Sequence, residues 1–219
     1  CVIWIDEQLQ FENSSVAMYN IPIVIQIVEQ TLSLNHLRNA LIMVIRKHKI
    51  LRTGLKYSAG KLEQHVNVIP EELINHDEYY LFAISYVSNK QELDKILQEE
   101  VNKQYFNLES GLVVRCHVIK HECETFDKDI LIHGDIVLFN LHHIAFDGGS
   151  VKPFLTDLQN AYNNNIVLNT NSIQYIDYAI YERQMLDDDS SDSDINQARI
   201  YWKTILDGYN TEKHLLPYD

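Results

Sequence analysis

Apolar positions along the chain follow two periods, and each period predicts a type of element. Residues 34–45 are apolar at helical spacing behind Ser33, which predicts a helix that Ser33 caps and that runs to about His48. Residues 136–141, interrupted only by Asn140, form a run that is too short to span a membrane. A short apolar run of this kind is typical of a buried strand.

The rest of the chain alternates between these two patterns. Ser88 and Gln91 match a capping box, and residues 58–60 are turn formers between two extended segments. Strands are predicted at 21–28, 51–57, 61–68, 112–119 and 130–142, and helices at 33–48, 88–104, 151–162, 175–185 and 195–206. This mixed order predicts one α/β layered domain over residues 1–219.

Composition narrows the class of protein. The 219 residues are 46% hydrophobic, which is enough for a substantial core, and no apolar run reaches the length of a membrane span. The net charge of −13 argues against a nucleic-acid partner. No charged leader precedes an apolar stretch, so no signal peptide is expected, and the start at Cys1 suggests an excerpt of a longer chain. Three cysteines at irregular spacing favour a cytoplasmic location.

Two other clusters are given structural interpretations. Cys116, His117, His121 and Cys123 lie close together, but neighbours on a strand face opposite ways and no second pair follows at finger spacing, so no metal is expected. The acidic stretch 187–194 is interpreted as a solvated flexible loop, because its spacing does not match a calcium-binding EF-hand.

The candidate chemistry lies where the buried strand ends. His142 and His143 are followed by Asp147 and Gly148, and strand alternation sends the two imidazoles to opposite faces. One imidazole is then held in the core while the other faces a cleft. Gly148 permits a turn with positive φ, and Ser150 is the expected cap of the next helix. A strand, a sharp turn with His and Asp, and a helix N-terminus together suggest a catalytic site.

This cluster resembles the central His-His-x-x-x-Asp-Gly motif of the condensation domains of nonribosomal peptide synthetases, within the chloramphenicol-acetyltransferase-like acyltransferases. Residues 46–55 resemble a second family motif, with one extra residue before His48 and with Leu55 in place of Phe. Residues 175–181 resemble a third, with Tyr181 in place of Trp. The resemblance implies a chloramphenicol-acetyltransferase-like sandwich of two layers, and it covers nearly the whole chain.

The resemblance implies acyl transfer, with amide-bond formation between a carrier-tethered thioester and an amine. His143 is then the general base or the amine-positioning group, and His142 packs inside. Asp147 is either a triad-like partner of imidazole or, as the family implies, half of a structural ion pair with Arg52 or with an arginine of a second lobe. Gly148 offers close backbone approach and an N–H for the oxyanion. No Ser or Cys lies in a nucleophile elbow, which favours direct transfer.

The implied partners are peptidyl carrier proteins, which deliver a phosphopantetheine arm, and adjacent synthetase domains; no cofactor is expected to bind the chain directly. Condensation domains have two similar lobes in about twice this length, so residues 1–219 are interpreted as the N-terminal lobe, inactive without the missing C-terminal lobe. A coenzyme A-dependent acyltransferase, an epimerising relative and a non-catalytic interaction domain are the alternatives.

Overall fold

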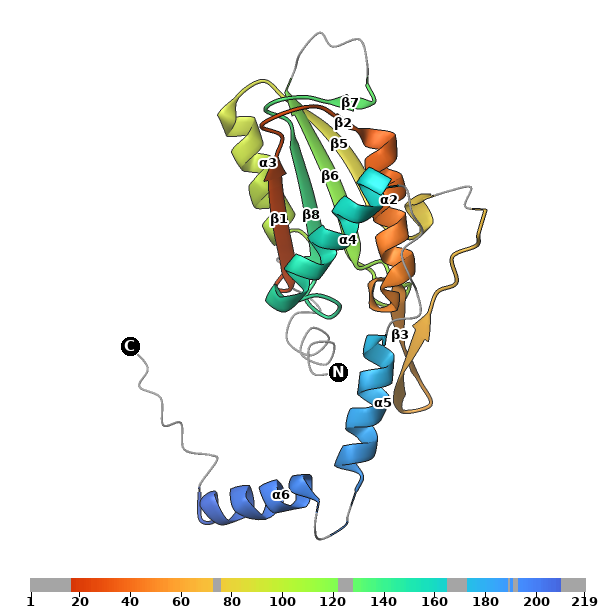
Figure 1. Cartoon of the computed structure of the whole chain (residues 1–219). Helices are drawn as coiled ribbons and strands as arrows, with labels where there is room; N and C mark the ends of the chain where they lie inside the picture. Colours follow the sequence, from red (N-terminus) through yellow and green to blue (C-terminus); the bar gives the residue numbers. More distant parts are fainter. Residues whose placement is uncertain are drawn as a thin grey trace. The chain divides into compact units, whose positions relative to one another are not determined.

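The computed structural model describes residues 17–72, 76–121, 128–164, 173–188, 190 and 193–209 (Figure 1). The chain divides into two compact units, residues 1–172 and residues 173–219. Among the described residues, every strand belongs to the first unit, and the second unit contains two helices.

A four-stranded sheet forms the centre of the first unit. Its order is β1 (Asn20–Gln26), β8 (Ile136–His142), β6 (Val114–His121) and β5 (Leu81–Val87). β8 pairs antiparallel with both of its neighbours, whereas β5 and β6 are parallel. Helix α3 (Lys90–Asn102) connects the two parallel strands, as a parallel pair requires a crossover. β8 therefore lies in the interior of the sheet.

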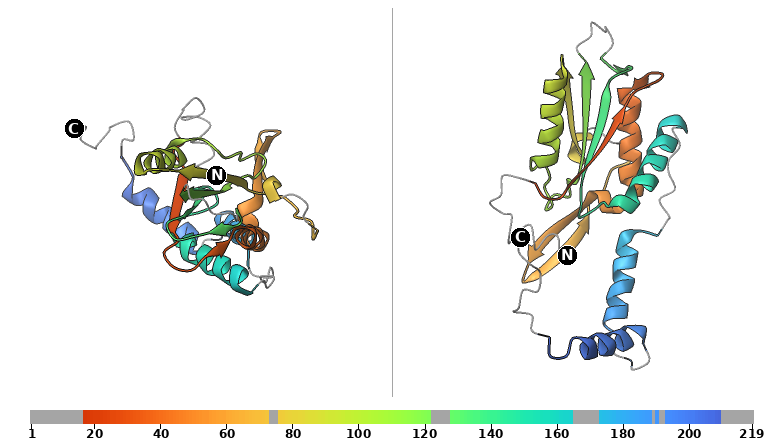
Figure 2. Two further views of the ribbon diagram at one scale, coloured as in Figure 1. Left: turned by 90° about the horizontal axis from the view of Figure 1, so that it is seen from above. Right: turned by 90° about the vertical axis from the view of Figure 1, so that its left-hand side faces the viewer.

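Helices cover both faces of this sheet (Figure 2). Phe139 of β8 belongs to the main core together with residues of α2 (Leu34–Lys47) and α4 (Val151–Asn164), which contact each other. Ile136 belongs to a smaller core with side chains of α3. All seven residues of β8 are buried, which explains why the strand is an almost continuous apolar run. The α3 layer is an addition to the two layers that the sequence predicted.

Most of these elements begin and end where local sequence signals, such as helix caps, predicted. The Ser33 hydroxyl accepts the backbone N–H of His36 at 3.2 Å, and α2 ends with His48 as its C-cap. At α3 the predicted cap is wrong by one residue: Asn89 accepts the N–H of Glu92 at 3.0 Å, and the Glu92 carboxylate accepts the N–H of Ser88 at 2.8 Å. The reciprocal pair is thus Asn89 with Glu92, because Glu92 is the side chain that reaches back.

The predicted hairpin is formed by β3 (Thr53–Ser58) and β4 (Lys61–Val66). Ala59 and Gly60 connect the strands with φ values of 50° and 79°. Positive φ at both central residues matches the twist of the two strands, and glycine adopts it without a steric penalty. A short helical turn, η1 (Lys49–Arg52), joins α2 to this hairpin, and a second, η2 (His76–Glu78), precedes β5.

Two predictions about strands were incomplete. The segment 130–142 is not one strand: β7 (Ile130–Leu131) pairs with β2 (Leu32–Ser33) in a separate two-stranded sheet. Gly134 breaks the segment with a φ of 94°, and the Asp135 carboxylate accepts the N–H of Ile132 at 2.9 Å. The residues of β5 were predicted as neither strand nor helix.

The second unit contains α5 (Tyr175–Leu186) and α6 (Asp194–Ile205), each within one residue of its predicted position. The predicted acidic loop is shorter than expected, because Ser193 caps α6 and Asp194 begins it. Residues 189, 191 and 192 of that loop lie outside the described residues. No described helix is both long and apolar enough to cross a membrane.

Candidate active site

His143 directly follows β8 and is exposed. Its backbone N–H donates to the carbonyl oxygen of Tyr19 at 2.8 Å, which extends the β1–β8 pairing past the end of both strands. The Tyr19 ring also lies edge-on to the His143 imidazole, with centroids 6.5 Å apart. The backbone of His143 is therefore held by the sheet while its side chain is open to a ligand.

His142 points to the other face, as strand alternation predicted. It is 2% exposed, and its ring packs against Phe106 at 5.7 Å and Tyr19 at 6.0 Å between centroids. Its Nδ1 accepts the backbone N–H of Ile144 at 3.1 Å. The neutral ring must then carry its proton on Nε2. His142 thus fixes the first turn after the strand from inside the core.

Asp147 organises the loop that follows. One carboxylate oxygen accepts the backbone N–H of Ser150 at 2.9 Å and its hydroxyl at 2.6 Å. The hydrogen bond from the Ser150 side chain, followed by that from its backbone, lowers the pKa of Asp147 below its ordinary value, and the nearby His143 adds to this. Asp147, not Ser150, is therefore the cap: it precedes the turn η3 (Gly148–Ser150), which leads into α4. Ser150 does not cap the helix; its backbone N–H is one of the donors that Asp147 caps.

Of the two ion-pair partners considered for Asp147, Arg52 makes no ion pair with it among the described residues, and an arginine of a second lobe stays a prediction. Arg52 donates from Nε to the carbonyl of Ile45 at 3.2 Å, from Nη2 to that of Arg46 at 3.3 Å, and from Nη1 to that of Asn67. Its guanidinium thus satisfies carbonyl groups at the C-terminal end of α2, where a cation is favourable. Among the described ion pairs, none joins Arg52 to Asp147.

Gly148 adopts a conformation other than the predicted one. Its φ is not positive: Gly148 begins the turn η3, and the Asp147 before it is extended, with a φ of −146°. A Cβ added at Gly148 would meet no atom within 4 Å. The position is therefore open, and the absence of a side chain leaves the backbone there accessible.

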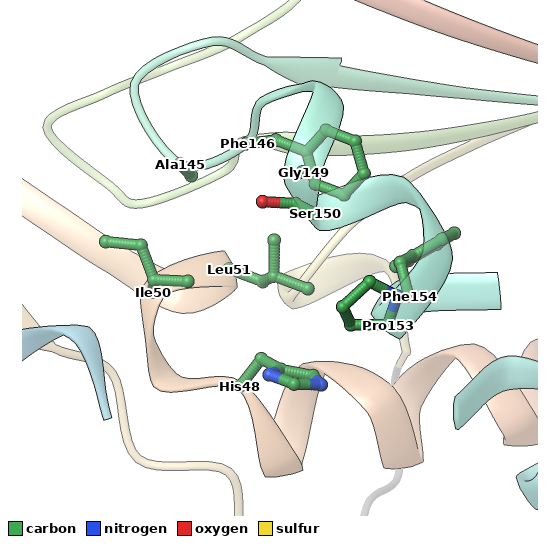
Figure 3. A pocket seen from close by; sticks show the side chains of 9 residues that line it. All are labelled: His48, Ile50, Leu51, Ala145, Phe146, Gly149, Ser150, Pro153 and Phe154. Atoms are coloured by element: carbon green, nitrogen blue, oxygen red, sulfur yellow. The ribbon is translucent and has the colours of Figure 1, made fainter. Parts of the chain in front are cut away.

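A cavity lies behind the same loop (Figure 3). Ala145, Phe146, Gly149 and Ser150 form one wall, and His143 is not among its lining residues. His48 forms part of another wall. The Nε2 atom of His48 lies 2.7 Å from a carboxylate oxygen of Asp157 in α4, and the other oxygen accepts Lys47 Nζ at 2.7 Å.

A buried polar network on the α3 face was not anticipated. Glu100 of α3 is fully buried, and its carboxylate contacts Arg115 Nε at 2.9 Å and His117 Nδ1 at 2.6 Å. His117 Nε2 lies 2.9 Å from the Ser85 hydroxyl, and the Asn140 amide donates to the Glu100 carbonyl at 2.6 Å. The sequence signal for this network was the polar pair at alternate positions 115 and 117, beside the apolar residues Val114, Cys116 and Val118 of the same strand.

The network determines the charge of Glu100. Burial alone raises the pKa of this carboxyl, but hydrogen bonds from His117 and Arg115, together with their charges, outweigh burial and lower the pKa to about 2. The contacts run from Ser85 to His117 to Glu100, as in a hydrolase triad. Arg115, however, also forms an ion pair with the Glu100 carboxylate. This arrangement fastens α3 to the sheet.

The interpretation of Cys116 and His117 as strand residues agrees with the structure. Cys116 is buried in the main core, whereas His117 points to Glu100 on the opposite face. Burial raises the pKa of the Cys116 thiol to about 12. Within the described ranges, no three His, Cys, Asp or Glu side chains are grouped to hold a metal ion. Cys123 lies outside these ranges.

Comparison with known proteins places the chain in a family. A family model described as "Condensation domain" matches residues 3–219. The chain belongs to the condensation-domain family. It is 36% identical over 120 residues, 55% of the chain, to a hybrid PKS-NRPS synthetase of Penicillium citrinum. It is 27% identical over 198 residues, 90% of the chain, to gramicidin S synthase 2 of Brevibacillus brevis. The matches span 3% and 4% of these relatives.

Solved structures share the fold. The X-domain from teicoplanin biosynthesis aligns with 94% of this chain and 42% of its own, with a TM-score of 0.73 and 23% identity. The starter condensation domain of rhizomide synthetase aligns with 96% of this chain and 47% of its own, with a TM-score of 0.68 and 15% identity. The mixed α/β fold is therefore confirmed as that of condensation domains. The chain covers a little under half of each, which is the size of one lobe.

Proposed function

We propose that this chain is the N-terminal lobe of a condensation domain that joins a carrier-tethered thioester to an amine in nonribosomal peptide synthesis. The observation that carries the proposal is the exposed His143 imidazole at the end of a fully buried, interior strand. Its neighbour His142 is held in the core and accepts a hydrogen bond from the turn. This contact fixes the backbone from which the exposed His143 ring projects.

In the proposed reaction the amine nitrogen attacks the thioester carbonyl carbon. The C–N bond forms, the C–S bond breaks, and the proton lost by nitrogen ends on the thiolate. His143 accepts or holds that proton, because an imidazole can act as a general base near neutral pH. The open backbone at Gly148 is the proposed donor to the oxyanion. The lobe binds no cofactor of its own: peptidyl carrier proteins of the same cytoplasmic synthetase deliver the thioester on a phosphopantetheine arm.

The role of Asp147 follows from its contacts with Ser150. It holds the loop between His143 and α4 in one conformation, and so acts on the reaction by positioning. An arginine of the second lobe remains the proposed partner for its exposed carboxylate. Arg52 supports the site from a distance, through the end of α2.

A substitution in the complete condensation domain tests the proposal. His143→Ala is expected to slow amide formation by about 10²-fold or more, the scale for loss of a positioned acid–base group. His133→Ala is the matched control, because His133 is also exposed but lies in the turn before the opposite end of β8. An unchanged single-turnover rate in His143→Ala would contradict the assignment.

The preferred thioester donor distinguishes the proposed function from its main alternative. A coenzyme A-dependent acyltransferase of this fold would use the same His143, so the assay is run with a carrier-bound and with a coenzyme A-bound acyl group. Faster transfer from the carrier supports the proposal. Transfer from coenzyme A alone would favour the alternative, and inversion of the donor without amide formation would indicate an epimerising relative. Absence of every reaction in the complete domain would indicate an interaction domain.

A further inference from the structure

The cavity behind the loop that follows His143 and leads into α4 has the features of a small-molecule site. It has a volume of about 180 Å³ and is formed by segments about a hundred residues apart in the sequence, the end of α2 with η1 and the loop that leads into α4 (Figure 3). Most of its lining is apolar, and only two side chains that face it are polar. The lining residues are His48, Ile50, Leu51, Ala145, Phe146, Gly149, Ser150, Pro153 and Phe154.

The walls of the cavity are fixed by the core. Leu51, Phe146 and Phe154 are each at most 4% exposed. The Phe146 ring meets the Phe154 ring edge to face at 5.7 Å between centroids, and Phe154 meets Phe139 of β8 at 5.3 Å. Because these rings are held on several sides, the cavity exists before a ligand arrives, and little ordering cost opposes binding.

Carboxylates outside the lining orient both polar groups. The Ser150 hydroxyl donates its only proton to Asp147 at 2.6 Å, so its oxygen has only lone pairs left. His48 Nε2 lies 2.7 Å from the carboxylate of Asp157, which is 12% exposed and also binds Lys47. In the neutral form of the ring, the carboxylate places the proton on Nε2, and Nδ1 is the acceptor. Both polar groups of the lining therefore accept hydrogen bonds.

The size and polarity of the cavity select a class of ligand. An apolar cavity of about 150 Å³ is known to hold benzene, so this volume suits one six-membered ring. The lining contains no Lys, Arg, Asp or Glu, and an ion would lose its hydration without a partner. Two side-chain acceptors without a side-chain donor favour a ligand that supplies a neutral donor, and a hydroxyl is the smallest such group on a single ring. We propose that this cavity binds a neutral, single-ring phenol whose hydroxyl donates to Nδ1 of His48.

Binding of four matched probes to the complete condensation domain that contains residues 1–219 tests the proposal. These are p-cresol, toluene, 4-methylanisole and benzylamine, measured by ligand-observed and protein-observed NMR at neutral pH. Fragments of this size bind in the micromolar to millimolar range. One hydrogen bond corresponds to about 3- to 10-fold in affinity, so p-cresol should exceed toluene and 4-methylanisole by about that factor. Binding of p-cresol should also shift the His48 imidazole resonances.

Two variants and a control locate the site. His48→Leu should remove the preference for p-cresol over toluene while toluene still binds. Ala145→Phe should abolish binding of all probes by filling the cavity. His36→Leu is the control, because His36 is an exposed histidine of α2 outside the lining.

Equal affinity for p-cresol and 4-methylanisole, a preference for benzylamine, or an unchanged preference in His48→Leu would overturn the proposal, as would absence of p-cresol binding at millimolar concentration. The measurement needs no acyl transfer, so its outcome is independent of the function proposed for His143.

Discussion

Removal of the buried charge of Glu100 is the most direct test of how the sheet and α3 are held together. Its side chain is 1% exposed, and the side chains of its partners Arg115 and His117 are 12% and 6% exposed. Glu100→Gln keeps the shape and one carbonyl acceptor but leaves a buried cation without a counter-charge. A broken buried pair of this kind costs about 3–5 kcal/mol.

The pKa of Glu100 gives an independent magnitude. The fall from the ordinary value of 4.5 to about 2 corresponds to about 3 kcal/mol of stability at neutral pH. Because the pKa is lower in the folded chain, this contribution is complete above pH 4.5 and is lost as the pH falls from 4.5 towards 2. The destabilisation caused by Glu100→Gln should therefore be large at about pH 7 and smaller at about pH 3.

Urea unfolding followed by far-UV circular dichroism at these two pH values measures both effects, and hydrogen exchange of β6 and α3 shows where the stability is lost. Glu99→Gln is the control: that side chain is 52% exposed and lies 4.0 Å from the exposed Lys95, so its loss should cost less than about 0.5 kcal/mol. A difference of less than about 1 kcal/mol between the two variants at neutral pH, or a difference that does not shrink at the acidic pH, would refute the reasoning.

Three further outcomes are expected. Phe139→Ala, which empties a fully buried position beside Phe154, should cost about 3–5 kcal/mol in urea unfolding, whereas Val24→Ala at a half-exposed position should cost far less. Asp147→Ala should lower the free energy of unfolding by about 1 kcal/mol through loss of its cap, and Asp147→Asn should retain most of it, since an amide oxygen can accept the same N–H. The 219-residue chain alone should be inactive and self-associate through unpaired apolar surface; sedimentation and an acyl-transfer assay would contradict this if they showed an active, stable monomer.

Much of the local structure was predictable because neighbours in the sequence decide it. Ser33 and the helical spacing of residues 34–45 were enough for α2, and Ala59 with Gly60 for the hairpin. The opposite orientations of His142 and His143 follow from the two-residue period of a strand, which holds in any tertiary setting. The family resemblance that the sequence suggested was confirmed over nearly the whole chain.

The tertiary structure decided the pairing of groups that are distant in sequence. Leu81–Val87 became a strand by parallel pairing with β6, and a short apolar segment does not reveal such a partner. Arg52 binds carbonyls at the end of α2 instead of Asp147, because the turn η1 brings its guanidinium within hydrogen-bond distance of them. Glu100 meets Arg115, and His48 meets Asp157, only after helices pack on the sheet. Periodicity tells which face a side chain takes, but only packing determines what lies opposite that face.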